Sequence, residues 1–130
     1  MANIQKVKAF WQDIELRDYE SLKTKFNPSA VIDWNNQNER FNVANFITAN
    51  EYYPGKWRIT VEKVYEINET VISVALCEMM DEKLHIEHSF YATSFFEFEK
   101  GVITYLSEYY SDNTPAPQWR QELNLSTPIK

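Results

Sequence analysis

The first part of the chain has the hydrophobic spacing of helices. Ile4, Val7, Trp11 and Ile14 recur every three or four residues, which places them on one face of an amphipathic helix. A second, shorter helix is predicted after Asp18, because an aspartate at that position can cap the first turn. We expect Pro28 to end this second helix. Its inward side chains are predicted to be Tyr19, Leu22 and Phe26.

A short strand and a third helix follow. The segment AVIDWN is predicted as the strand, and VANFITANEYY as the helix, with Asn42 at its N-cap position. Pro54-Gly55 is expected to stop this helix. The residues predicted on its inner side are Phe46, Ile47 and Tyr53.

The remainder alternates between apolar and polar residues, as strands do. Asn68-Glu69 and Lys100-Gly101 are predicted turns between adjacent strands. Because the helices come first and the strands follow, we expect an α+β domain with helices on one face of an antiparallel sheet. The predicted strand segments are KWRITVEKVYEI, TVISVALCEMM, KLHIEHSFYATSFFEFE and VITYLSEYY.

The last predicted hairpin is apolar on both faces. One face is expected to pack on the helices, and no predicted element remains to cover the other. An exposed apolar patch of this kind usually marks an interface, so we predict a two-fold homodimer through the outer face. The alternative is that these are scattered surface aromatics. The outer residues are predicted to be Phe95, Ile103, Tyr105 and Tyr109.

The C-terminal segment differs from the rest in composition. Residues 115–130 are rich in proline and have the composition of a loop, and Trp119 is the bulky aromatic residue among them. We therefore predict one domain over residues 1–114. Residues 115–130 are predicted to form an extension that docks on the domain or on the dimer partner.

Composition and charge narrow the function classes. The chain has 130 residues, of which 44% are hydrophobic and 15% aromatic, which suits one domain with a real core. The net charge is −6 and the cationic residues are scattered, so nucleic-acid binding is not expected. No apolar stretch approaches a membrane span, and the N-terminus lacks the apolar core of a signal peptide. We expect a cytoplasmic protein with no membrane partner.

Metal and cofactor motifs are also missing from the sequence. It contains no CxxC pair, no HExxH and no glycine-rich phosphate loop, so neither a metal nor a cofactor is expected. The single cysteine, Cys77, lies in an apolar predicted strand. A buried, inert thiol is the expected state there.

Segments spread over nearly the whole chain resemble the nuclear transport factor 2-like superfamily, on its SnoaL-like (polyketide cyclase-like) side. The segments are RDYESLKTKFNPSAVIDW, NERFNVANFITANEYYPGKWRITVEKV, SFFEFEKGVITYLSEYYSD and APQWR. The resemblance implies a cone-shaped α+β fold, in which three N-terminal helices pack on a strongly curved, mostly antiparallel sheet. It also implies a pocket at the open end and agrees with a homodimer through the outer sheet face. It does not indicate one activity, because this fold hosts enzymes and binding proteins alike.

The resemblance also argues against steroid-isomerase chemistry. Carried over from the ketosteroid-isomerase branch, the position of the general base falls on Trp34. The position of the acid that holds the oxyanion falls on Ser94, and the helix-borne tyrosine falls on or near Phe10. Tryptophan cannot shuttle a proton and phenylalanine cannot donate to an oxyanion. That chemistry is therefore not expected.

The same carry-over predicts an aromatic pocket. Besides Glu108, the residues that it makes face inward are Ile32, Trp34, Ser94, Phe96, Leu106 and Tyr110. Alternation back from Ser94 adds Phe90, Ala92 and His88. A bulge in this strand would change the facing of His88. The helices are expected to add Trp11, Tyr19 and Tyr53. The predicted ligand-binding residues are Trp11, Tyr19, Ile32, Trp34, Tyr53, Phe90, Ser94, Phe96, Leu106 and Tyr110.

His88 and Glu108 are the predicted proton-transfer pair. An imidazole titrates near neutrality, and burial raises the pKa of a carboxyl group. For His88 the alternative is a hydrogen-bonded core or rim residue. For Glu108 it is a structural ion pair with Arg58 or Arg40. Asp33 alternates away from Trp34 and is expected at the surface.

Two functions remain open. The first is a pocket protein that binds an apolar or aromatic small molecule, with cofactor-free acid/base isomerase, cyclase or lyase chemistry. The second is a non-catalytic dimeric binding or interaction module whose pocket is filled by its own side chains. An open cavity would separate them.

Overall fold

A computed structural model describes residues 2–130 as three N-terminal helices, a six-stranded sheet and a C-terminal extension that contains a fourth, short helix. The α+β class and the three N-terminal helices are confirmed. The helices are α1 (Asn3–Leu16), α2 (Tyr19–Lys23), α3 (Val43–Tyr52) and α4 (Gln118–Glu122). The strands are β1 (Phe26–Trp34), β2 (Glu39–Asn42), β3 (Lys56–Ile67), β4 (Thr70–Met80), β5 (Ile86–Glu99) and β6 (Val102–Asp112). A short 3-10 turn, η1 (Asn35–Gln37), joins β1 to β2.

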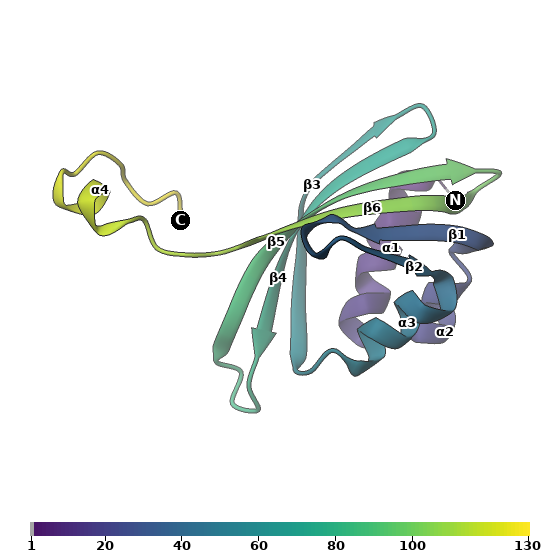
Figure 1. The fold of residues 1–130 in the computed structure, drawn as a ribbon, viewed down its shortest axis with the longest axis horizontal. Coiled ribbons are helices and arrows are strands. Elements are labelled where there is room, and N and C mark those ends of the chain that lie inside the picture. The colour runs from purple at the N-terminus through teal and green to yellow at the C-terminus, as the bar shows by residue number, and fades with distance from the viewer. Residues whose placement is uncertain (1) are drawn as a thin grey trace.

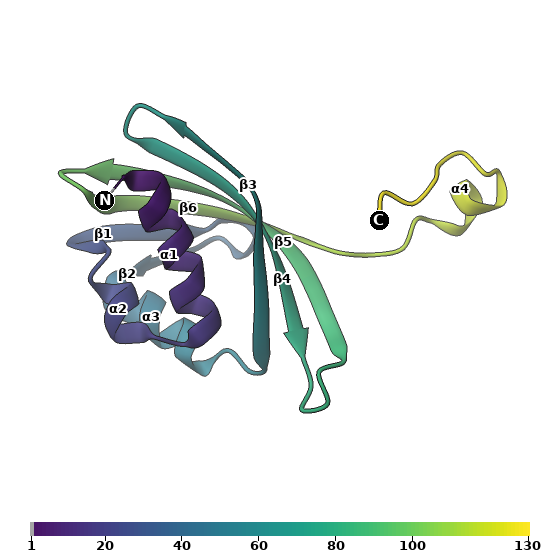
Figure 2. The ribbon, with the colours of Figure 1, turned by 180° about the vertical axis from the view of Figure 1, so that it is seen from behind.

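The sheet is strongly curved and covered on one face. Its strand order is β2-β1-β6-β5-β4-β3, and neighbouring strands are antiparallel except for the parallel pair β1 and β6. Helices α1, α2 and α3 all lie on the same side of it, as the two opposite views show (Figures 1 and 2). One face of the sheet is therefore internal, and within residues 2–130 no helix covers the other face.

Local signals explain where several elements begin and turn. The Asp18 side chain accepts a hydrogen bond from the Ser21 amide at 3.1 Å, and Asn42 accepts one from the Asn45 amide at 2.8 Å. Both are N-caps at the predicted positions. The predicted turn at Lys100-Gly101 has φ values of 51° and 81°, the left-handed conformation that tight hairpins require.

The end of α2 and the start of β1 were predicted wrongly. Helix α2 ends at Lys23 rather than at Pro28, so Phe26 and Pro28 belong to β1. The register between β1 and β6 shifts between Phe26 and Val31, and proline is tolerated there because it need not donate to a regular ladder. Strand β2 was not predicted, because four mostly polar residues at a sheet edge carry little hydrophobic pattern.

The predicted outward facing of Ile103 is also wrong. Glu97 pairs with Tyr105, but the next residue of β5, Phe98, pairs with Ile103. Thr104 is therefore an extra residue, and this bulge reverses the facing of the strand beyond it. Ile103 is fully buried in the core.

Aromatic rings join the helices to the sheet in the core. Phe10 of α1 lies edge-on to Phe96 of β5 with centroids 5.0 Å apart, and its ring also contacts Phe26 and Phe46 at 6.2 and 6.3 Å. Phe10, Phe46 and Phe96 are essentially inaccessible to solvent. Within residues 2–130, no helix has the length and apolar composition to cross a membrane.

The C-terminal extension leaves the domain after β6. It projects to one side as an arm that contains α4, which was not predicted (Figures 1 and 2). Trp119 is 59% exposed. At its end, the Lys130 ammonium pairs with Glu62 and donates to the Tyr91 hydroxyl. Docking of Trp119 on the domain or on a partner subunit stays a prediction.

Candidate functional site

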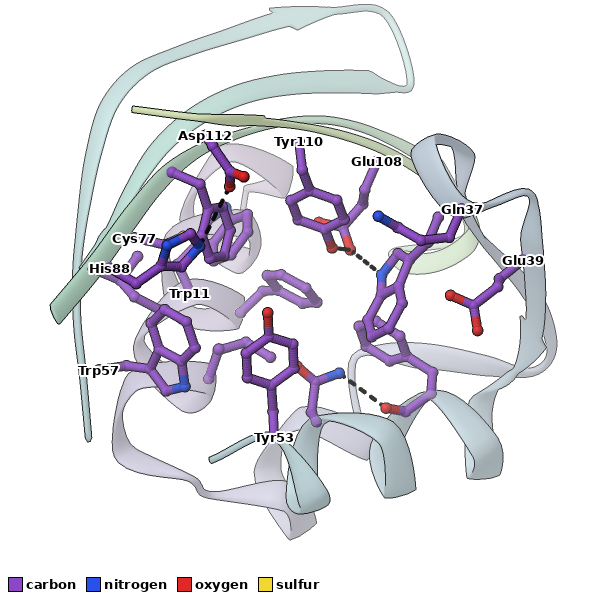
Figure 3. Close-up of a pocket in the computed structure, with 17 residues that line it drawn as sticks. Trp11, Gln37, Glu39, Tyr53, Trp57, Cys77, His88, Glu108, Tyr110 and Asp112 are labelled. Atoms are coloured by element: carbon purple, nitrogen blue, oxygen red, sulfur yellow. Dashed lines mark hydrogen bonds and ion pairs between the residues drawn. The ribbon is translucent and has the colours of Figure 1, made fainter. Parts of the chain in front are cut away.

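A cavity of about 370 Å³ opens between the helices and the inner face of the sheet (Figure 3). Its walls come from α1, α3, β1, β3, β4, β5 and β6, and its rim from η1 and β2. This volume lies in the range of cavities that hold small organic molecules. Most of its wall is apolar, with polar groups at the floor and the mouth.

A continuous series of aromatic rings forms much of the wall. Tyr53 lies 5.3 Å from Trp57, Trp57 lies 5.6 Å from Phe90, and Phe90 lies 5.4 Å from Tyr110, measured between ring centroids. Tyr110 then lies 6.0 Å from Trp34. The successive ring planes meet at angles of 57°, 78°, 83° and 81°, which is the tilted to edge-on packing that aromatic pairs prefer.

Arg17 holds the mouth of the cavity in place. This residue ends α1 in a left-handed conformation, with φ of 57°. Its guanidinium donates to the backbone carbonyls of Tyr53, at 2.9 Å, and Gly55, and to the Tyr19 hydroxyl at 3.1 Å. These bonds tie the end of α1 to the segment between α3 and β3, which carries Tyr53 and Trp57.

Glu108 is a buried carboxyl group at the floor, with 2% of its surface exposed. One oxygen accepts hydrogen bonds from Trp34 Nε1 and the Tyr110 hydroxyl, both at 3.1 Å. The other accepts one from Ser94 Oγ at 2.6 Å. Trp34 and Ser94 are the two positions to which the resemblance assigned an isomerase's base and acid. Here both side chains donate to Glu108 instead.

Burial raises the pKa values of Glu108 and Tyr110. Desolvation raises the pKa of Glu108, while the hydrogen bonds from Ser94, Trp34 and Tyr110 partly oppose that rise. Burial, and then the neighbouring Glu108, raise the pKa of Tyr110 well above its usual value. Glu108 is thus a weaker acid than a solvated glutamate, which is the direction of shift that acid/base catalysis near neutral pH uses.

His88 lies at the mouth and pairs with Asp112. Its Nε2 is 3.3 Å from Asp112 Oδ1, and the two side chains are 40% and 67% exposed. Strict alternation from Ser94 to His88 is preserved, because the register shift in β5 lies beyond His88, between the pairs Met79–His88 and Met80–Ile86. Both His88 and Glu108 line the cavity, and no hydrogen bond joins them in the described part of the chain. Their role in proton transfer stays a prediction.

The structure divides the predicted pocket residues into two groups. Trp11, Trp34, Tyr53, Phe90 and Tyr110 line the cavity. The other five do not line it: Ile32, Ser94, Phe96 and Leu106 are fully buried beneath it, and Tyr19 packs beside the core and donates to the Asn50 carbonyl. The sheet and helices are in direct contact at that depth, so the cavity occupies only the open end.

Several lining residues were missed. Trp57 and Ile59 alternate along β3, and this signal was present in the sequence. Gln37 and Glu39 reach the rim because η1 is held against β6, where Asn36 Oδ1 accepts from the Tyr110 amide at 2.7 Å. Nothing local marks that contact. The lining residues not predicted are Phe10, Ile14, Gln37, Glu39, Phe46, Asn50, Trp57, Ile59, Cys77 and Asp112.

The alternative of a structural ion pair for Glu108 is wrong. Arg40 instead binds Asp33 through two bonds of 2.7 and 2.9 Å, and Arg58 binds Glu78 at 3.0 Å. Asp33 is therefore not a free surface carboxylate. It also accepts from the Tyr105 hydroxyl at 2.5 Å, and these bonds, led by that from Arg40, lower its pKa to about 2.

Cys77 lies in the cavity wall and is buried. Desolvation, with a smaller contribution from Glu108, raises the pKa of its thiol. The thiol is therefore protonated at neutral pH, in agreement with the expected inert side chain.

The chain matches known proteins by structure rather than by sequence. It matches no protein-family model and no curated protein. A candidate ketosteroid isomerase from Kribbella flavida has a TM-score of 0.81 at 15% identity, over 98% of this chain and 91% of that one. An NTF-2 like protein of unknown function from Burkholderia xenovorans has a TM-score of 0.74 at 20% identity, over 97% and 94%.

A third similar structure contains a small organic molecule. This protein from Catenulispora acidiphila, with a ketosteroid isomerase-like fold, was solved in complex with trimethylamine. Its TM-score is 0.70 at 14% identity, over 82% of this chain and 85% of that one. At these identities the likeness establishes the fold. The chain therefore has the nuclear transport factor 2-like fold, shared by ketosteroid isomerase-like and SnoaL-like proteins.

Proposed function

We propose that this protein binds a small molecule with a largely apolar or aromatic body and carries out cofactor-free acid/base chemistry on it. The observation that carries the proposal is an open aromatic cavity of about 370 Å³ with one buried carboxyl group at its floor. The trimethylamine complex of the Catenulispora protein supports small organic molecules as the class to test in this fold.

Glu108 is the proposed proton-transfer group on the ligand. Its three donors hold the carboxyl group in one orientation, and burial raises its pKa. Such a group can take a proton from a ligand atom and return it to another, which is the basis of isomerisation, cyclisation and elimination without a cofactor. Trp34 occupies the wall position of an isomerase's base, so the chemistry starts from Glu108 instead.

His88 is the proposed partner at the mouth. Its Nε2 faces Asp112 Oδ1 at 3.3 Å, so Nδ1 is the ring nitrogen that the proposal assigns to the ligand. His88 and Glu108 approach the cavity from different depths, so a ligand between them would contact both. The proposal therefore assigns the two groups to opposite ends of one ligand.

The second candidate is a binding module without catalysis. The observation in its favour is that Glu108 already accepts three hydrogen bonds and so has a complete structural role. Within this candidate, the open volume argues against a pocket filled by its own side chains.

A thermal-shift screen against a metabolite library tests binding. A ligand present at a hundred times its Kd raises the free energy of unfolding by about 2.7 kcal/mol. Ile14 lines the cavity and Leu16, on the same helix, is 65% exposed. Ile14→Trp should therefore abolish the shift by filling the cavity, whereas Leu16→Trp should preserve it. Shifts that survive Ile14→Trp would place the ligand elsewhere.

Variants of the two titratable groups then separate the candidates. For any reaction found with a hit, His88→Ala and Glu108→Gln should each abolish turnover while far-ultraviolet circular dichroism stays that of the wild type. Binding without turnover in the wild type would favour the binding module.

We also propose a homodimer through the outer sheet face. Phe95 and Tyr109 contact each other there, at 6.1 Å between centroids, and Ile72 lies opposite Phe95 on the neighbouring strand. Tyr109 is 49% exposed. The arm supports the same assembly, because its apolar side chains have little contact with their own domain: Trp119, Leu123, Leu125 and Ile129 are 59%, 63%, 62% and 98% exposed.

A further inference from the structure

The cavity is acidic as well as aromatic. Three carboxyl side chains line it: Glu108 at the floor, and Glu39 and Asp112 near the mouth (Figure 3). Of residues 2–130, no lysine or arginine lines it, and His88 is the one basic side chain in its wall. A carboxylate or phosphate ligand would lose its hydration there and meet like charges instead of a cationic partner.

The arginines around the cavity are engaged elsewhere. Arg40 is held by Asp33, and Arg58 by Glu78. The Arg17 guanidinium donates to the carbonyls of Tyr53 and Gly55. Turning any of them inward would break bonds that the structure already makes. Within residues 2–130, none of these three arginines therefore offsets the negative character of the cavity.

The aromatic wall favours the same ligand charge. Trp34, Trp57, Tyr53 and Tyr110 all line the cavity, and these ring types attract cations through the negative potential of their faces. The attraction grows when the cation is removed from water, as it is in an enclosed site. Glu108 adds a fixed carboxyl group in contact with two of these rings.

We propose that the ligand is an organic cation: an amine, protonated or quaternary, carried on an apolar body. The ammonium group would lie against Trp34 and Tyr110, where its positive charge would favour the ionised form of Glu108 as its counter-charge. Glu39 and Asp112 would attract the cation to the mouth. The apolar body would occupy the wall formed by Trp57 and Phe90. This inference rests on the proposed function, since it names the ligand class of the same cavity.

Three probes of similar size and shape test the ligand charge on the wild-type protein. They are phenyltrimethylammonium, its neutral isostere tert-butylbenzene, and the anion 4-tert-butylbenzoate, each followed by ligand-observed NMR and by titration calorimetry. We expect phenyltrimethylammonium to bind at least about tenfold more tightly than tert-butylbenzene, a difference of about 1.4 kcal/mol. The benzoate should not bind.

The outcomes separate this inference from the proposed function. If tert-butylbenzene binds as tightly as the ammonium probe or more tightly, the cavity binds apolar ligands but the inference is wrong. Preferential binding of the benzoate also overturns it. If none of the three binds, both the inference and the proposed use of the cavity fail.

Two variants locate the counter-charge. Glu108→Gln should weaken phenyltrimethylammonium about tenfold and leave tert-butylbenzene unchanged, because only the cation senses the lost charge. The matched change at an exposed carboxylate outside the cavity, Glu99→Gln, should leave the affinity for both probes unchanged. Should Glu108→Gln not fold, the three probes on the wild type still decide the inference.

Discussion

The two faces of the sheet have similar hydrophobic content and different surroundings. On the inner face, Phe96 is fully buried against Phe10, and Glu108 has three hydrogen-bond donors. On the outer face, Phe95 and Tyr109 contact each other but stay partly exposed. The difference lies in the cover: of the helices in the described part of the chain, three pack on one face and none on the other (Figures 1 and 2). Alternation along a strand thus identifies apolar faces, but packing decides whether a face becomes core, cavity or contact surface.

The neighbouring residues Phe96 and Phe95 provide the most direct test of this comparison. Phe96→Ala should lower the free energy of unfolding by about 3–5 kcal/mol, because it removes a fully buried ring and leaves a cavity. Phe95→Ala should cost about 1 kcal/mol in the monomer, since the ring is only partly buried. Urea denaturation of both variants at low protein concentration gives the two values. Equal losses would mean that the outer face is as tightly packed as the inner one.

The outer face can be tested through assembly. Tyr109→Glu should weaken the proposed homodimer at least about tenfold, because it places an unpaired charge in an apolar contact. Tyr109 is a cleaner position than Tyr105, whose hydroxyl is bound to Asp33. Ser111→Glu, two residues further along the same strand and exposed, is the matched control. Sedimentation analysis at micromolar concentrations measures both. A wild-type protein that remains monomeric would refute the dimer.

The buried carboxyl group on the inner face predicts a pH dependence of stability. The pKa of Glu108 is raised in the folded protein, so the folded state binds its proton more tightly than the unfolded chain, where the pKa is about 4.3. Stability should therefore fall as pH rises from about 4.3 to the folded pKa, by at most about 1.4 kcal/mol per pH unit, and then level off.

Glu108→Gln tests this pH dependence, because it removes the titrating group. The difference in unfolding free energy between wild type and variant, measured by urea denaturation across this range, should shift in favour of the variant as pH rises. Cys77 and Tyr110 are the titratable neighbours, and both stay protonated there. A difference that does not change with pH would mean that Glu108 titrates as it does in the unfolded chain.

The arm gives the smallest expected effect. Deleting residues 115–130 should lower the melting temperature by about 2–5 °C if the arm docks on a partner. The decrease should then depend on protein concentration, and Trp119→Ala should reproduce part of it. A decrease that is independent of concentration would instead point to contacts of Lys130 with its own domain. No decrease at all would make the arm a free end.

Sequence reasoning succeeded where the cause of a structure is local. The caps at Asp18 and Asn42 and the turn at Lys100-Gly101 depend on residues within a few positions, and all three lie where they were predicted. It failed where a register shift intervenes. The bulge at Thr104 turns Ile103 inward, and the residue types at that position do not indicate that the strand contains an extra residue.

The candidate site divides in the same way. The aromatic lining residues Trp34, Phe90 and Tyr110 follow from alternation and the resemblance of the chain to a known superfamily, and the structure places them in the wall. The partners of Glu108 do not follow from either. Trp34 is 74 positions away in the chain, and an ion pair with Arg58 or Arg40 was equally consistent with the sequence.

By itself, the sequence determined the three N-terminal helices, the long strands and the apolar character of both sheet faces, since helix caps, turns and periodicity act over a few residues. The tertiary structure alone decided how deep the cavity reaches. Ser94, Phe96 and Leu106 are buried in the core below the cavity. The nearby Arg40 and Arg58 pair with other carboxylates, so the lining of the cavity is acidic. The physical reason is that sheet curvature, strand register and side-chain pairing arise from contacts between distant segments, and local sequence does not specify them.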